Sequence, residues 1–283
     1  MIEIDAVSEL LQSKRYSQIK EHFKEINPAD AAAIIQELYE LRDDSESLII
    51  LFRLLPKSIA AETFAYLDSD MQKLLIDAFT DKELKDVLDD IFVDDAVDMV
   101  EEMPANVVKR ILLNTDVETR NAINQILQYP KDSAGSIMTI EYVELKRHMT
   151  VEQAFDHIRT TGLDKETIYT CYIKDSDRRL IGIVTVKDLL LADKSEVVED
   201  IMETNIVCVN THEDREVVAE KFTKYDFLAI PVVDNEERLV GIVTVDDVID
   251  VIREETTEDI EKMAAITPSD RPYLKIGIFE TWK

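Results

Sequence analysis

The sequence Gly-Ile-Val-Thr-Val-x-Asp occurs twice and places a threonine three residues before an aspartate, at Thr185 and Asp188 and again at Thr244 and Asp247. This spacing has two interpretations. The threonine can cap a helix while the aspartate faces the positive end of the helix dipole. Alternatively, the hydroxyl and the free N–H groups at the helix start bind a phosphate, and the aspartate binds a ribose diol. Spacing alone leaves both interpretations open.

A row of carboxylates is the second feature with chemical potential. If a helix follows Thr244, one face of it carries Asp247, Asp250, Glu254, Glu258 and Glu261. A shorter row is formed by Asp94, Asp98 and Glu101. Like charges one turn apart destabilise a helix by about 0.2–0.5 kcal/mol each, and the basic residues nearby in the sequence are only Arg253 and Lys262. Either the rows face open water or cations bind along them, and Mg²⁺ suits such sites because one or two carboxylates hold it among several waters.

The overall charge favours cations as partners. The chain has 60 acidic and 32 basic residues and a formal charge of -28. Phosphate-rich nucleic acids need Lys and Arg, and anionic membranes attract basic patches, so neither is expected as a partner. The two cysteines and four histidines lack ligand spacing, which argues against zinc and against a disulfide framework.

Three further absences narrow the class of protein. No signal peptide opens the chain and no run of about 18 apolar residues occurs, so this segment is expected to be soluble and cytoplasmic. No nucleophile–base pair and no glycine-rich phosphate loop is visible, so an enzyme is not expected.

The first ~130 residues predict an all-helical domain. Glycine is absent before Gly135, and apolar residues recur at helical spacing, for example over 34–41 and 84–91. Prolines such as Pro28 separate the segments, and Asp or Ser before short apolar runs, as at Asp30 and Ser58, marks successive helix starts. Stacked short helices of this kind predict a superhelical arrangement.

After a Pro- and Gly-containing boundary at 129–136, strands alternate with helices, which indicates an α/β unit. The strands are expected at 168–173, 181–184, 206–209, 229–233 and 240–243. The segment 179–188 recurs at 238–247 with eight of ten positions identical, and Ile137-Met138 recurs as Ile201-Met202. The chain therefore contains a tandem duplication, with the extra residues of the first copy expected in the loop 160–165.

The two copies resemble cystathionine-β-synthase (CBS) domains, which occur in pairs. The resemblance is carried by Ile137-Met138-Thr139, by 230–234 (Ile-Pro-Val-Val-Asp) and by the repeated Gly-Ile-Val-Thr-Val-x-Asp. It implies an adenine nucleotide, such as ATP, bound between the copies. The residues it implies for nucleotide binding are Tyr169, Thr185, Asp188, Phe227, Pro231, Thr244 and Asp247.

Beyond the CBS pair, the chain resembles the cytosolic part of MgtE-type magnesium channels along nearly its whole length, through 129–139, 246–260 and Asp94-Asp95-Ala96-Val97-Asp98. The implied fold class is α + α/β. An acidic helical N-domain (1–130) precedes CBS domain 1 (131–200), CBS domain 2 (201–255) and a connecting or plug helix with a membrane-proximal segment (256–283). The resemblance implies Mg²⁺ shared among carboxylates of these parts. Its candidates are Glu62, Asp94, Asp98, Glu216, Asp226, Asp246, Asp247, Asp250, Glu255, Glu258 and Asp259.

Two functions follow from these features. The first is a magnesium-sensing domain at the cytoplasmic face of the cell membrane, where Mg²⁺ bridges the N-domain and the CBS domains and closes a transmembrane pore expected C-terminal to this fragment. The alternative is an adenine-nucleotide-sensing CBS module that regulates another transporter or enzyme. Copy one has Lys187 where copy two has Asp246, and this lysine favours a phosphate in copy one. Asp247 is a candidate both for nucleotide binding and for Mg²⁺ binding. A homodimer is expected through the CBS domains, with Val248, Ile249 and Ile252 as apolar candidates.

Overall fold

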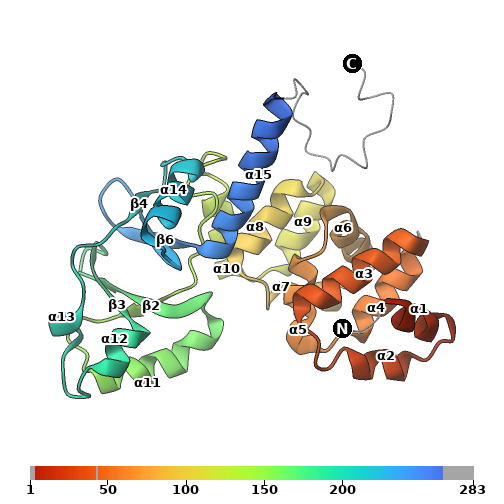
Figure 1. Cartoon of the computed structure of the whole chain (residues 1–283), viewed down its shortest axis with the longest axis horizontal. Coiled ribbons are helices and arrows are strands. Elements are labelled where there is room, and N and C mark those ends of the chain that lie inside the picture. Colours follow the sequence, from red (N-terminus) through yellow and green to blue (C-terminus); the bar gives the residue numbers. More distant parts are fainter. Residues whose placement is uncertain (1–3, 43, 264–283) are drawn as a thin grey trace. The chain divides into compact units, whose positions relative to one another are not determined.

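The computed structural model describes residues 4–42 and 44–263; the side chain of Glu261 and the residues 264–283 of the predicted connecting segment lie outside this description. The chain divides into two compact units, Met1–Gln128 and Tyr129–Lys283 (Figure 1). The first is helical throughout its described part, and the second combines strands and helices. The predicted architecture, an all-helical domain followed by an α/β unit, is confirmed.

Unit 1 is a run of short helices joined by tight turns. Their bounds are α1 Ile4–Gln12, α2 Tyr16–His22, α3 Pro28–Arg42, α4 Ser45–Leu54, α5 Lys57–Ala65, α6 Ser69–Ala78, α7 Asp81–Leu88, α8 Val93–Glu102, α9 Ala105–Asn114 and α10 Val117–Ile126. Side chains of Asp44, Asp68, Thr80 and Asp116 accept hydrogen bonds from backbone N–H groups at the starts of α4, α6, α7 and α10. These caps satisfy N–H groups that lack a partner within the helix.

The helices of unit 1 stack with an alternating pattern. Helix α3 packs on α5, α5 on α7 and α7 on α9, while α4 packs on α6 and α8 on α10. Contact with the helix two places along the chain produces the superhelical arrangement that the sequence predicted. The aromatic core contains Phe52, Phe64 and Phe79, whose ring centroids lie 5.4–6.3 Å apart.

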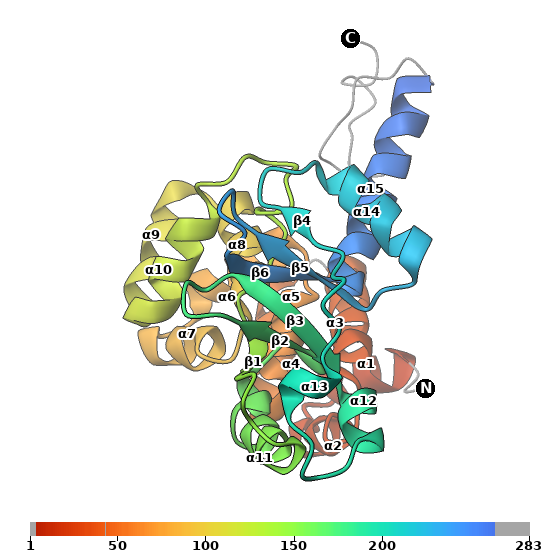
Figure 2. The ribbon, with the colours of Figure 1, turned by 90° about the vertical axis from the view of Figure 1, so that its left-hand side faces the viewer.

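Unit 2 contains two three-stranded sheets with the same topology (Figure 2). The first sheet has the order β1 (Tyr142–Leu145), β2 (Thr167–Lys174), β3 (Leu180–Thr185), and the second has β4 (Val209–Asn210), β5 (Ala229–Val233), β6 (Leu239–Thr244). In each sheet the first pair is parallel and the second antiparallel. The helices are α11 Val151–Thr161, α12 Val186–Leu191, α13 Val198–Ile201, α14 Arg215–Tyr225 and α15 Val245–Met263, with a 3₁₀ turn at Gly162–Asp164.

The short segment before each copy pairs with the sheet of the other copy. Thr139, which precedes β1, exchanges backbone hydrogen bonds with Ile242 of β6 (2.8 and 2.9 Å). In the same way Glu203 exchanges hydrogen bonds with Ile183 of β3 (2.8 and 3.0 Å). The two sheets also share an apolar contact, in which the fully buried Tyr172 packs against residues of the second copy. The two copies are therefore joined by hydrogen bonds and by a shared apolar cluster, while the first copy also has a core of its own.

The repeat located most strands correctly, with two differences. Strand β1 was not predicted, because Tyr-Val-Glu-Leu alternates apolar and polar residues over only four positions. Strand β4 is two residues long, shorter than the predicted 206–209. The extra residues of copy one fall where predicted, at the 3₁₀ turn between α11 and β2.

Candidate nucleotide and magnesium sites

The first Thr-x-x-Asp motif forms a capping box. Thr185 ends β3 and is the N-cap of α12. The Asp188 N–H donates to Thr185 Oγ1 (3.1 Å), the Thr185 N–H donates to Asp188 Oδ2 (3.2 Å), and the Thr185 hydroxyl donates to Asp188 Oδ2 (2.5 Å). Both side chains are thus engaged with each other, as the capping interpretation expected, and Asp188 is exposed. A ligand at this helix start would have to replace these bonds.

The second motif has a different arrangement. The buried hydroxyl of Thr244 lies 2.5 Å from Asp246 Oδ1 and 2.7 Å from Asp247 Oδ2. A hydroxyl has one proton, so it donates fully to one carboxylate at a time. Two carboxylates therefore converge on one oxygen at the start of α15, where copy one has Lys187 instead of the first aspartate. This is the chemical difference between the two copies.

The three residues predicted to contact an adenine ring, Tyr169, Phe227 and Pro231, differ in how far they are exposed to solvent. Tyr169 on β2 is 64% exposed. Phe227 is half-buried and stacks on Tyr225, with ring centroids 5.3 Å apart. Pro231 is buried in β5 opposite Ile242. Among the three, Tyr169 offers the most open aromatic surface.

The carboxylates of helix α14 and helix α15 meet where the two helices pack together. A side-chain hydrogen bond with Glu255 raises the pKa of Glu216, and the neighbouring charges of Glu255, Asp214 and Asp259 raise it further. Two carboxyl groups share one proton more readily than they both ionise at hydrogen-bond distance. Three of the predicted magnesium ligands, Glu216, Glu255 and Asp259, are therefore close enough to affect one another.

Arg215 is a residue that the sequence argument missed. It forms ion pairs with Glu254 (2.9 Å), Glu255 (2.9 Å) and Asp132 (3.3 Å). Burial lowers the pKa of Arg215, but these three carboxylates outweigh burial and raise it. The expectation that little basic charge neutralises the acidic row was therefore incomplete, because a cation on α14 reaches it through tertiary packing. The signal in the sequence was an arginine directly before Glu216.

The other predicted ligands of unit 2 are dispersed. Asp250 pairs with Arg253 (3.1 Å) and Glu258 with Lys262 (2.7 Å). Asp226 is exposed and caps the end of α14 in the left-handed conformation (φ 53°). Glu258 and Asp259, expected on a separate connecting helix, lie on α15, which runs without a break from Val245 to Met263.

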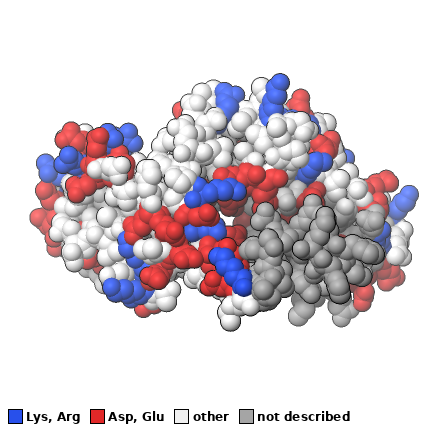
Figure 3. Space-filling view, turned by 90° about the horizontal axis from the view of Figure 1, so that it is seen from above, with Lys and Arg blue, Asp and Glu red and all other residues white. Residues whose placement is uncertain are grey.

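In unit 1 the predicted ligands lie on two helices. Glu62 is exposed on α5. Asp94, 8% exposed, and Asp98, exposed, lie one turn apart on α8. Acidic side chains form patches on the surface shown in Figure 3, interrupted by basic ones. Within the described residues, however, no group of three or more His, Cys, Asp or Glu side chains is arranged as a ready metal site.

Within the part of the chain that the structure describes, no helix has the length and apolar character needed to cross a bilayer.

Helix α15 exposes Ile249 and Ile252, whereas Val248 is 1% exposed. The predicted assignment of Val248 to an exposed apolar face is wrong, because this side chain packs inside its own unit.

These features define a protein with an acidic helical domain and a tandem CBS pair. The model of the MgtE intracellular N domain matches residues 26–132, and the CBS domain model matches residues 134–195 and 198–254. The chain belongs to the MgtE family of magnesium transporters.

Relatives and solved structures agree with this assignment. The magnesium transporter MgtE of Thermus thermophilus is 37% identical over 281 residues, which are 98% of this chain and 61% of the relative. That of Bacillus subtilis is 37% identical over 172 residues, 61% of this chain and 38% of the relative. The chain therefore matches less than two thirds of the length of these relatives.

The fold is also similar to two solved structures. One is the cytosolic domain of the Mg²⁺ channel MgtE in complex with ATP, with a TM-score of 0.81, 36% identity and coverage of 88% of this chain and 99% of that chain. The other is the soluble part of a magnesium transporter, with a TM-score of 0.80, 29% identity and coverage of 89% and 97%.

Proposed function

We propose that this chain is a magnesium sensor at the cytoplasmic face of the cell membrane, where it gates a magnesium-conducting pore that belongs to the same protein. The observation that carries the proposal is the packing of α14 against α15, which brings the carboxylates of Glu216 and Glu255 close together. Carboxyl groups held this close repel when both are ionised, and a divalent cation between them relieves the repulsion. The family of the chain supports magnesium as the cation.

In this mechanism Mg²⁺ is shared between the N-domain and the CBS pair. The proposed ligands are Glu62, Asp94 and Asp98 of the N-domain, Glu216, Asp226, Asp246 and Asp247 of the second copy, and Asp250, Glu255, Glu258 and Asp259 along α15. Without magnesium the two acidic units repel, and with magnesium they approach and hold α15 in the closed state.

Many weak sites suit such a switch. A site at ten times its Kd stabilises the bound state by roughly 1.4 kcal/mol. A shift of a two-state equilibrium from 1:99 to 99:1 needs about 5.5 kcal/mol. About four sites that bind only in the closed state are therefore sufficient.

Small-angle scattering tests the proposal directly. We expect the radius of gyration to fall as Mg²⁺ rises through the millimolar range, and to change much less with Na⁺ at matched ionic strength, because general screening does not bridge specific carboxylates. Changing Asp94, Asp98, Asp247 and Asp250 to asparagine should abolish the magnesium response. A control with the same charge change at exposed acids elsewhere, Glu9, Glu37, Glu40 and Asp177, should retain it. Equal compaction by Na⁺ would show that screening, not bridging, causes the effect.

A nucleotide role is the second candidate, supported by exposed Tyr169 beside the Thr185–Asp188 motif and by Lys187 as a partner for phosphate. The similar MgtE cytosolic domain was solved in complex with ATP. We expect ATP to bind in calorimetry and Asp188→Ala to weaken it. Absence of heat with ATP, ADP and AMP at millimolar concentration would leave the motif as a helix cap alone.

A homodimer through the CBS pair is also proposed. Ile249 and Ile252 on α15 and Leu190 and Leu191 on α12 are exposed apolar side chains on elements of both copies. Sedimentation should show a dimer at tens of micromolar, and Ile249→Glu with Ile252→Glu should shift it to monomer. A wild-type chain that remains monomeric with and without Mg²⁺ would contradict this assembly.

A further inference from the structure

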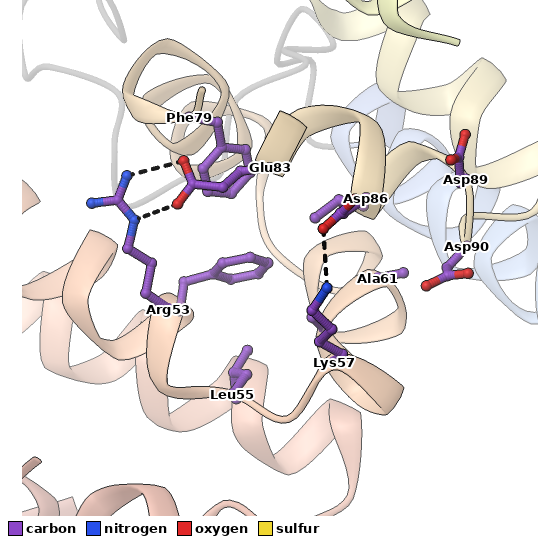
Figure 4. A pocket seen from close by; sticks show the side chains of 12 residues that line it. Arg53, Leu55, Lys57, Ala61, Phe79, Glu83, Asp86, Asp89 and Asp90 are labelled. Atoms are coloured by element: carbon purple, nitrogen blue, oxygen red, sulfur yellow. Dashed lines mark hydrogen bonds and ion pairs between the residues drawn. The ribbon is translucent and has the colours of Figure 1, made fainter. Parts of the chain in front are cut away.

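Unit 1 contains a pocket of about 360 Å³ lined by α4, α5 and α7, which lies within the helical domain itself (Figure 4). Its floor is apolar. Phe52, Leu55, Phe79 and Val87 line it, and each is 5–7% exposed, so they present edges of the core rather than free side chains. A ligand with an apolar body can cover these edges and remove them from water.

One wall of the pocket is acidic. Glu83, Asp86 and Asp90 follow one another along α7 and just beyond its end, and all three line the pocket. The rise of 1.5 Å per residue places the backbones of Glu83 and Asp86 about 4.5 Å apart along the axis. The pocket thus combines a series of carboxylates with apolar side chains, and Figure 4 shows Glu83 beside Phe79, with Asp86 and Asp90 further along the same wall.

The opposite wall supplies two cations. Arg53 binds Glu83 with two hydrogen bonds (2.9 and 3.2 Å), which holds that carboxylate firmly. Lys57 binds Asp86 at 3.1 Å, but the Lys57 side chain is 90% exposed. Exposed pairs of this kind contribute about 0–1 kcal/mol, so a second ammonium group can replace Lys57 at Asp86.

The charges of the side chains that line the pocket determine whether it favours an anion or a cation. Two basic residues, Arg53 and Lys57, face four acidic ones, Glu83, Asp86, Asp89 and Asp90, so negative charge exceeds positive charge in the lining. Asp89 is bound by Lys85 (2.7 Å) from outside the pocket. Asp90 is exposed and has no ion pair or hydrogen bond from its side chain within the described residues. The lining therefore repels anions and offers carboxylates to a cation.

We propose that this pocket binds an aliphatic polyamine, a chain of methylene groups with two or more ammonium ends. The methylene groups cover the edges of Phe52 and Phe79, one ammonium group replaces Lys57 at Asp86, and another reaches Asp90. Hydrated Mg²⁺ matches the site poorly, because the ion keeps several of its water molecules and these make no favourable contact with the apolar side chains. The proposal goes beyond the magnesium function and does not depend on it.

Calorimetry with spermidine and the full chain tests this proposal. Saturating Mg²⁺ and physiological ionic strength are present throughout, so that general attraction to a chain of charge -28 is screened and competed away. We expect one spermidine per chain. Asp90→Asn should weaken binding about tenfold, as expected for the loss of one hydrogen bond to a charged group. Glu37→Gln, a matched change at an exposed carboxylate on α3, should have no effect.

A steric variant separates the pocket from general charge attraction. Ala60 on α5 lines the pocket and is half-buried, so Ala60→Leu fills the space without changing any charge. It should abolish spermidine binding while the far-ultraviolet circular dichroism of the chain is unchanged. If Ala60→Leu reduces folding, Asp90→Asn remains decisive, since this side chain is exposed and caps no helix. The proposal is overturned if spermidine does not bind, if folded Ala60→Leu binds it normally, or if Glu37→Gln weakens binding as much as Asp90→Asn.

Discussion

Alanine at two equivalent glycines should have unequal effects, although the glycines occupy the same place in each repeat. Gly182 packs under Met202, and Gly241 packs under Met138. The three atoms nearest to a Cβ at Gly182 all belong to the side chain of Met202, which is half-buried, and the nearest of them, Sδ, can move by rotation of that side chain. A Cβ at Gly241 would lie 2.7 Å from Met138 Sδ and 2.7 Å from the carbonyl oxygen of Thr139.

The carbonyl group of Thr139 determines how much stability Gly241→Ala loses. It accepts the Ile242 N–H (2.9 Å) in the exchange between the copies, and Met138 is fully buried, so neither neighbour can move freely. Overpacking of this kind costs about 1–3 kcal/mol. Neither glycine has a positive φ, so alanine also gains about 0.4–1 kcal/mol through the unfolded chain. We expect Gly182→Ala to be nearly neutral and Gly241→Ala to lose about 1–2 kcal/mol.

Thermal unfolding measures the difference. For a unit of this size the expected decrease in Tm is about 2–4 °C per kcal/mol, hence about 2–8 °C for Gly241→Ala. Shortening the methionine supplies a control, measured as a double-mutant cycle. Met202→Ala should remove any remaining cost of Gly182→Ala, whereas Met138→Ala should not restore Gly241→Ala, because the carbonyl stays in place. Equal losses at the two glycines, or a larger loss at Gly182, would refute this reasoning.

Three further predictions concern the second unit. Arg215→Gln should lower the free energy of unfolding by about 1 kcal/mol, measured in urea, because Glu254 and Glu255 lose their shared cation, and added Mg²⁺ should restore more stability in the variant than in the wild type. Glu216 has a pKa above its usual 4.5 in the folded chain, so the folded state holds more protons and the wild type loses stability as pH rises through the interval above 4.5. Glu216→Gln should therefore stabilise the magnesium-free chain at pH 7 and lose this advantage below pH 4.5, and a benefit that grows on acidification would contradict the sign. Thr185→Ala should cost about 1 kcal/mol through loss of the helix cap, and urea unfolding should show no such loss for Thr223→Ala on the surface of α14.

The repeat made much of the second unit predictable. Sequence identity at 179–188 and 238–247 located β3 and β6 and the helices that follow them, because both depend on local pattern. Strand β1 was not predicted, because four residues of alternating polarity are too short a pattern to indicate a strand unless its neighbouring strand is already known. Its pairing with β2 is a tertiary fact.

The candidate site was less predictable than the fold. The spacing placed carboxylates on α15, but it said nothing of α14, which packs beside that helix and brings Arg215 and Glu216 to it. The same limit explains Val248, whose burial depends on what covers α15. Positions along one helix follow from its period, whereas the charges that face it from another helix do not.

The exchange of segments between the copies has a consequence for how such a pair can arise and be divided. Thr139 lies in the segment before the first copy but pairs with Ile242 in the sheet of the second copy. Glu203 lies in the segment before the second copy but pairs with Ile183 in the sheet of the first copy. A single repeat cut out of the chain would keep a segment with no sheet to join and a strand edge with no partner. An ancestor with one repeat would therefore have needed a second molecule to supply the missing segment, and gene duplication would have turned that partnership between molecules into one within a single chain.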